Sequence, residues 1–122
     1  MNAKRDSNPQ NRLIFACSGA ADVGQIADLA ARRLMQQGGG RMYCLAGMGG
    51  RVPAILETTR TATAILAIDG CPQECARKTL EQAGFTNFRH LQLEDLGLTK
   101  GNHPATAERV EIVVRRAAEL LA

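Results

Sequence analysis

Four cysteines are the residues of this 122-residue chain whose type and spacing best suit chemistry. Cys17, Cys44 and Cys71 each lie where an apolar segment ends, and Cys75 lies four residues after Cys71. If these segments are parallel strands, their carboxyl ends meet at one edge of a sheet, where α/β proteins build their sites. Thiols that are far apart in the sequence would then converge, as a soft metal ion or a redox centre requires.

These thiols have three chemical interpretations: metal ligands, redox groups, or inert cysteines of the core. Tetrahedral zinc–thiolate bonds of about 2.3 Å place the sulfurs roughly 3.8 Å apart. Neighbouring strands lie about 4.8 Å apart, so their ends come within reach of that spacing. Four cysteines at equivalent positions favour a shared site over unrelated core positions. We therefore predict a zinc site with the ligands Cys17, Cys44, Cys71 and Cys75.

Two other uses of the same thiols follow from the sequence. An iron–sulfur cluster also takes four cysteines, but the spacing matches no standard ferredoxin pattern, so we expect zinc. A redox site is the main alternative, because Cys71 and Cys75 can approach disulfide geometry across one helical turn. Cys17 would then be a third thiol that could resolve an oxidised Cys71.

The spacing of Cys71 and Arg77 also resembles the Cys-x5-Arg loop of phosphatases. In such a loop, backbone N–H groups and the arginine hold an oxyanion beside a thiolate. Pro72 removes one N–H group from this loop, and Glu74 would place a carboxylate beside the anion. A short spacing of this kind is a weak signal, and we do not favour a phosphatase.

Strands that position the cysteines are predicted over residues 13–17, 41–45, 63–69 and 87–93, where short apolar or alternating runs occur. Helical periodicity follows each of them. This alternation predicts an α/β fold: a single three-layer domain with a four-stranded, mostly parallel sheet. The most economical strand order is 2-1-3-4, which is a flavodoxin- or Rossmann-like arrangement.

Cap residues predict where the helices begin. Asp22 is the expected N-cap of the first helix, with Gln25 completing a capping box. Pro53 suits the first turn of a short helix, and the last helix is expected to begin near Pro104. Cys71 is the expected N-cap of the helix after the third strand, where free N–H groups would favour its thiolate form.

The sequence also predicts roles for residues around the cysteine site. The sequence predicts that glycines 47, 49, 50 and 70 leave room for the sulfurs, and that Asp69 forms the turn at the end of its strand. Arg51 and Lys100 are candidate counter-charges for the thiolates. His103 is interpreted as a solvated loop residue, while His90 lies within a strand and receives no role.

The segment Asp69-Gly70-Cys71, followed by Pro72-Gln73-Glu74-Cys75, resembles the signature of the DGC-domain family, a group of proposed zinc-binding proteins. Two further features also resemble that family: Cys17 before Ser-Gly, and Cys44 before a glycine-rich stretch. The resemblance extends from Leu13 to the C-terminal helix. It implies a zinc site formed by the same four cysteines, and it implies no particular reaction.

The composition is 45% hydrophobic and 22% charged, which suits one globular domain, and the net charge of +3 is scattered. Aromatic residues make up 3%, so the stacking platform of a nucleic-acid binder is not expected. No run approaches the roughly 18 apolar residues of a membrane span. We predict a disordered polar leader over residues 1–12, a DGC-like zinc-binding domain over 13–122, and a cytoplasmic location.

The predicted function is a metal-binding protein that holds one zinc ion at the carboxyl edge of its sheet, in metal sensing or trafficking. A domain of this size should fold without a metal, so the site is expected to serve function rather than folding. The alternative is a thiol redox or sulfur-carrier protein that uses Cys71 and Cys75. The expected partner is a metal ion, neither membrane nor nucleic acid is expected, and a protein partner and catalysis are left undecided.

Overall fold

A four-stranded parallel sheet forms the centre of the computed structural model, which describes residues 8–122. The strands are β1 (Arg12–Ala16), β2 (Arg41–Met42), β3 (Ala64–Asp69) and β4 (Arg89–Gln92). They run in the order β2-β1-β3-β4, and each neighbouring pair is parallel. The predicted fold class and strand order are therefore confirmed.

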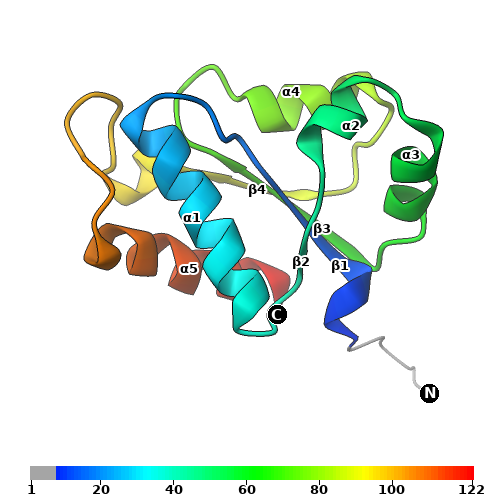
Figure 1. Cartoon of the computed structure of the whole chain (residues 1–122), viewed down its shortest axis with the longest axis horizontal. Helices are drawn as coiled ribbons and strands as arrows, with labels where there is room; N and C mark the ends of the chain where they lie inside the picture. The colour runs from blue at the N-terminus through cyan, green and yellow to red at the C-terminus, as the bar shows by residue number, and fades with distance from the viewer. Residues whose placement is uncertain (1–7) are drawn as a thin grey trace.

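Helices cover both faces of the sheet, with α1 and α5 on one side and α2, α3 and α4 on the other (Figure 1). Their bounds are α1 Asp22–Gln36, α2 Leu45–Gly49, α3 Pro53–Arg60, α4 Cys75–Gln82 and α5 Ala107–Leu121, with short 3-10 helices η1 (Pro9–Asn11) and η2 (Leu93–Leu96). This is the predicted three-layer arrangement.

The core has two parts, because successive side chains of a strand point to opposite faces of the sheet. Ile14 packs in the cluster with α1 and α5, whereas Phe15 packs in the cluster with α2 and α4. Both side chains are fully buried. Cys17 and Cys71 contact these clusters from their edges, so the thiols lie at the rim of the core.

Three helix starts differ from the sequence prediction. Ala21 is the N-cap of α1, and the carboxylate of Asp22 makes contacts elsewhere. The glycine-rich stretch after Cys44, for which the sequence predicts no helix, forms the short helix α2. The last helix begins at Ala107 with Thr106 as its N-cap, because the Thr106 side chain accepts a hydrogen bond from the N–H of Arg109.

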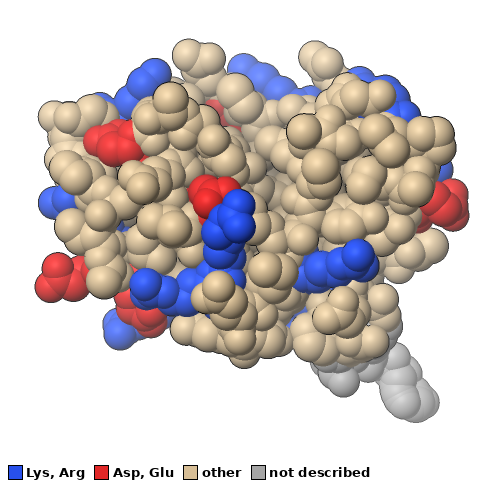
Figure 2. Space-filling model, in the orientation of Figure 1, with Lys and Arg blue, Asp and Glu red and all other residues tan. Residues whose placement is uncertain are grey.

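Only part of the predicted leader belongs to the described residues. Of the leader predicted over residues 1–12, residues 1–7 lie outside the described part, while η1 and the first residue of β1 occupy the remainder. Figure 2 shows Lys and Arg side chains in separate groups on this face, with acidic side chains close to several of them. Within residues 8–122, no helix combines the length and apolar character that a bilayer crossing needs.

Candidate metal centre

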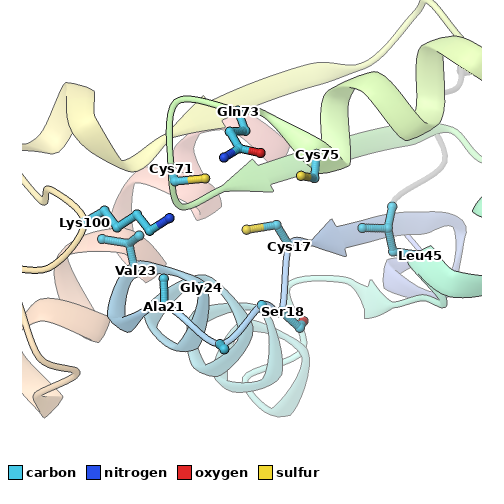
Figure 3. Close-up of a pocket in the computed structure, with 12 residues that line it drawn as sticks. Cys17, Ser18, Ala21, Val23, Gly24, Leu45, Cys71, Gln73, Cys75 and Lys100 are labelled. Atoms are coloured by element: carbon cyan, nitrogen blue, oxygen red, sulfur yellow. The ribbon is translucent and has the colours of Figure 1, made fainter.

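A cavity of about 590 Å³ opens at the carboxyl edge of the sheet. Three of the four cysteines, Cys17, Cys71 and Cys75, line it. Figure 3 shows their sulfur atoms turned toward one shared space, which the amino group of Lys100 also faces. The wall is mostly apolar; its other members are Ser18, Gly19, Ala20, Ala21, Val23, Gly24, Leu45 and Gln73.

Cys17 follows directly after β1 and continues its hydrogen bonding. Its N–H donates to the carbonyl of Ile68 at 2.9 Å, and its Sγ accepts a hydrogen bond from the N–H of Gly70 at 3.3 Å. Burial raises the pKa of the Cys17 thiol, and the nearby charge of Asp69 raises it further, while the Gly70 N–H opposes both. A metal ion that bound here would have to displace a proton held by the fold.

The loop after β3 makes a turn before α4 begins. The carbonyl of Cys71 accepts hydrogen bonds from the N–H of Glu74 at 3.2 Å and from the side chain of Gln92 at 2.9 Å. Glu74 has φ 58°, a left-handed conformation that ordinary residues rarely adopt. This turn separates the two thiols, which face each other across it in Figure 3.

The predicted cap position of Cys71 is therefore wrong. Helix α4 begins at Cys75, which occupies its first helical position, and Glu74 is the N-cap. The positive end of the helix dipole lies beside Cys75 rather than Cys71. The two cysteines belong to a turn and a helix start, not to one helix face.

Cys44 lies beside the cavity but does not line it. Strand β2 ends at Met42, and Cys44 is instead the N-cap of α2, where its Sγ accepts a hydrogen bond from the N–H of Gly47 at 3.2 Å. It lines a second cavity of about 580 Å³. The two cavities adjoin, because Leu45 belongs to both walls.

Of the four glycines, Gly70 and Gly47 lie in close contacts, and these are made mainly with groups other than sulfur. A Cβ on Gly70 would lie 2.6 Å from the backbone of Val23, so this glycine lets the loop approach the start of α1. A Cβ on Gly47 would lie 2.8 Å from Ile55 and 3.4 Å from the Cys44 sulfur. The predicted role of clearing space for sulfur is thus wrong for Gly70 and secondary for Gly47.

Asp69 anchors α4 to the sheet from the end of β3. Its carboxylate is fully buried and accepts hydrogen bonds from the N–H groups of Ala76 at 2.7 Å and Arg77 at 3.0 Å. It also lies 2.8 Å from Nε2 of His90, and Nδ1 of that ring lies 4.0 Å from a Glu74 oxygen. A buried carboxylate with these partners fixes the direction in which α4 leaves the turn.

Lys100 is the charged residue of the cavity wall, and its loop is tied to the start of α1. The Asp22 carboxylate accepts hydrogen bonds from the N–H groups of Gly101 at 2.9 Å and His103 at 3.0 Å. These hydrogen bonds hold the pKa of Asp22 below its ordinary value. Among the described residues, the Lys100 ammonium has no hydrogen bond or ion pair.

Three residues discussed in the sequence, Arg51, His103 and Arg77, do not line the cavity. Arg51 donates to the carbonyls of Met48 at 3.0 Å and Gly49 at 3.1 Å, at the end of α2. Nδ1 of His103 accepts a hydrogen bond from the N–H of Thr99 at 2.9 Å, within its own loop. Arg77 forms an ion pair with Glu74, so its guanidinium does not face an anion beside Cys71.

The donor set suits a soft metal ion, since three thiols face one space and thiolates are the ligands that zinc and other soft ions prefer. In the conformation described for residues 8–122, no three His, Cys, Asp or Glu side chains lie close enough together to hold an ion. Binding would require the Cys71–Cys75 turn and the thiol rotamers to close on the ion. Cys44 would also have to leave its hydrogen bond to Gly47.

Sequence reasoning missed His90 and the tertiary role of Asp22. His90 pairs in register with Ala67, so both point to the α4 side of the sheet. A polar residue at such an inward position of a strand was the available signal. Asp22 resembled an ordinary N-cap, and nothing local indicates that its partners lie 79 and 81 residues away.

Comparisons with known proteins show which family the chain is similar to. The model of the DGC domain family matches residues 13–117. A protein of Pseudomonas aeruginosa, the anaerobic and virulence modulator AnvM, is 40% identical over 88 residues, which span 72% of this chain and 67% of that protein. No solved structure gives a significant match.

Proposed function

Because this chain belongs to the DGC-domain family, we propose that it is a metal-binding protein that holds one zinc ion between cysteine thiolates, in metal sensing or trafficking. The observation that carries this proposal is the convergence of Cys17, Cys71 and Cys75 on one cavity. They come from two strand ends and a helix start, and a fold has little reason to gather three free thiols unless they act together.

The first three ligands in this proposal are Cys17, Cys71 and Cys75. Cys44 is the fourth ligand that the sequence predicts, and it lies in the adjoining cavity, one residue before the shared Leu45. Joining the site would cost it the hydrogen bond from Gly47. Lys100 offsets the negative charge that several thiolates bring to one ion.

Sensing or trafficking suits this site better than a structural role. Cys17 and Cys71 pack at the rim of two hydrophobic clusters whose fully buried members include no cysteine. Two of the thiols, Cys44 and Cys75, are exposed, so an ion could be received from and returned to another ligand. The name of the Pseudomonas relative describes a modulator, and a metal-responsive modulator is compatible with this arrangement.

A second candidate function uses the same thiols for redox or sulfur transfer. Cys71 and Cys75 face each other across the turn (Figure 3), and Cys17 lies beside them. Oxidation would join Cys71 and Cys75 in a disulfide, and the two electrons and protons would pass to an oxidised low-molecular-weight disulfide, which becomes two thiols.

The test is the zinc content of protein purified under anaerobic conditions, together with the thiols that react before and after denaturation. We expect about one zinc per chain and thiols that become reactive only after denaturation or chelation. Cys17→Ser, Cys71→Ser and Cys75→Ser should each lower zinc affinity by at least about tenfold, because each removes one thiolate.

The matched control is Ser18→Ala, which changes an adjacent wall residue that carries no thiol. This variant should keep its zinc. Protein without bound zinc, with all four thiols reactive at once and a reversible Cys71–Cys75 disulfide, would contradict the metal function and support the redox alternative.

A further inference from the structure

The cavity at the carboxyl edge of the sheet has the size of a small-molecule site. Its volume of about 590 Å³ falls within the roughly 300–1,000 Å³ that is typical of sites for organic ligands. Most of its wall is apolar. Figure 3 shows Ala21 and Val23 on one side of this space and Leu45 on the other. A short carbon chain in the cavity would therefore have apolar contacts on both sides.

The wall of this cavity carries one basic side chain. Among the described residues that line it, Lys100 is basic, and none is Asp or Glu. Figure 3 shows the amino group of Lys100 directed into the space that the thiols face. This ammonium has no hydrogen bond or ion pair within the described part of the chain. An apolar space beside one unmatched positive charge suits a molecule that carries one negative charge.

The backbone on either side of Lys100 is held in place by Asp22. The Asp22 carboxylate accepts hydrogen bonds from the N–H groups of Gly101 at 2.9 Å, His103 at 3.0 Å and Val23 at 2.8 Å. Asp22 therefore fixes the loop to the start of α1, and its own charge is engaged by the backbone. A charged group whose position is set before binding loses less freedom when a ligand arrives.

The second cavity differs from the first in its charges. Arg32 and Asp28 both line it and form an ion pair, with 2.7 Å between Nε and Oδ2. The hydroxyl of Ser18 donates to the other oxygen of Asp28 at 2.8 Å. An organic anion in the second cavity would have to compete with Asp28 for Arg32. The unmatched charge of Lys100 thus distinguishes the first cavity.

From these observations we propose that the first cavity binds a small aliphatic carboxylic acid, whose carboxylate pairs with Lys100 and whose chain packs against Val23 and Leu45. A single ammonium matches the single charge of a carboxylate. Binding forms and breaks no covalent bond. This inference goes beyond the proposed function, because the acid contacts Lys100 and the apolar wall and needs no metal ion.

The experiment titrates the full chain with acetate, butyrate and hexanoate at neutral pH. Metal is first removed with a chelator that is then dialysed away, because Lys100 is also the counter-charge in the proposed zinc site, and the reductant is an uncharged phosphine. We expect affinity to rise about three- to fourfold for each added CH₂ group. The methyl NMR signals of Val23 and Leu45 should shift on binding. Those of Ile112, which is exposed on α5 and outside the wall, should not.

Lys100→Met separates the effect of the charge from that of the apolar wall. It should weaken hexanoate binding about two- to fivefold at low ionic strength, and less at high salt. Binding of the uncharged probe 1-hexanol should not be weakened. Leu45→Ala should weaken the binding of both probes about three- to tenfold through lost apolar contact. The matched control Ile112→Ala, which shortens an exposed aliphatic side chain on α5, should bind both as the native chain does.

Affinity that does not rise with chain length would overturn this inference. Equal weakening of hexanoate and 1-hexanol by Lys100→Met would do the same, as would shifts at Ile112 without shifts at Val23 and Leu45. These outcomes leave the proposed function standing, because zinc content is measured on separate preparations. Conversely, protein that binds hexanoate as described but holds no zinc when purified anaerobically would contradict the proposed function and support this inference.

Discussion

Lys100 contributes charge to the candidate site without holding any other group in the described part of the chain. Its ammonium is exposed, so its attraction to bound thiolates is partly screened by solvent. Lys100→Met should weaken zinc affinity about two- to fivefold at low ionic strength, and less at high salt. Competition against a chromophoric chelator at several salt concentrations measures the zinc affinity.

Arg116→Met is the control for Lys100→Met, because it removes one positive charge from α5, away from the cavity. Its zinc affinity should match that of the native chain at every salt concentration. Equal weakening in both variants would show that net charge, rather than the position of Lys100, is responsible.

Asp69 is the residue on which the geometry of the loop depends most. An amide at this position keeps one acceptor but sets its NH₂ group against the donors that the carboxylate now serves. Asp69→Asn should lower the free energy of unfolding by about 2–4 kcal/mol, since buried donors lose their partner. His90→Gln keeps a side-chain donor and should cost less, and urea unfolding gives both values. If Asp69→Asn lowered the free energy of unfolding no more than substitution of an exposed residue does, the role of Asp69 in holding the loop would be contradicted.

Gly70 couples two elements, because the loop after β3 passes against the first turn of α1 at this residue. A Cβ there would press on the Val23 backbone, which cannot move as a flexible side chain can. Gly70→Ala should lower the free energy of unfolding by about 2–3 kcal/mol and weaken zinc binding, because it separates Cys71 from Cys17. Urea unfolding and zinc titration measure the two effects.

Gly49→Ala is the matched variant in helix α2, where the nearest atom to the new Cβ is 3.8 Å away. It should leave zinc binding unchanged and stabilise the fold by up to about 1 kcal/mol, as expected for alanine in place of glycine in a helix. Equal changes in the free energy of unfolding and in zinc affinity for Gly70→Ala and Gly49→Ala would show that the close approach of the loop to α1 at Gly70 affects neither quantity.

At the level of elements, the sequence predicts what depends on local patterns. The apolar run of β3 and the periodicity of α5 are strong signals, and the parallel order follows from their alternation. The start of α4 could not be predicted in this way, because Asp69 and Gln92 hold the turn from outside the helix. Cys44 does not lie at a strand end as predicted, because β2 ends two residues before it. The convergence of three thiols was thus predictable, and the separate position of the fourth was not.

Asp22 joins the start of α1 to the Lys100 loop, and this link depends on pH. The N–H groups of Gly101 and His103 lower the pKa of Asp22 from its ordinary 3.8. A carboxyl with a lowered pKa stabilises the fold above its unfolded pKa, and this contribution is lost as the pH falls through the folded pKa. The urea midpoint of the native chain should therefore exceed that of Asp22→Asn at neutral pH. The difference should shrink below about pH 4. Asp95→Asn, which changes an exposed carboxyl, should show no such convergence.

For the whole molecule, the two hydrophobic clusters carry the fold, and the thiols lie at their rim. Removal of zinc with a chelator should therefore leave the far-UV circular dichroism within about a tenth of its original value, because a core of this size does not need a metal. Zinc at about a hundred times its dissociation constant adds roughly 2.7 kcal/mol, so the chelated protein should melt about 8–12 °C lower. Readdition of zinc should restore the melting temperature. Loss of the helical signal on chelation would mean that the ion holds the fold together, and the proposed sensing or trafficking role would then give way to a structural one.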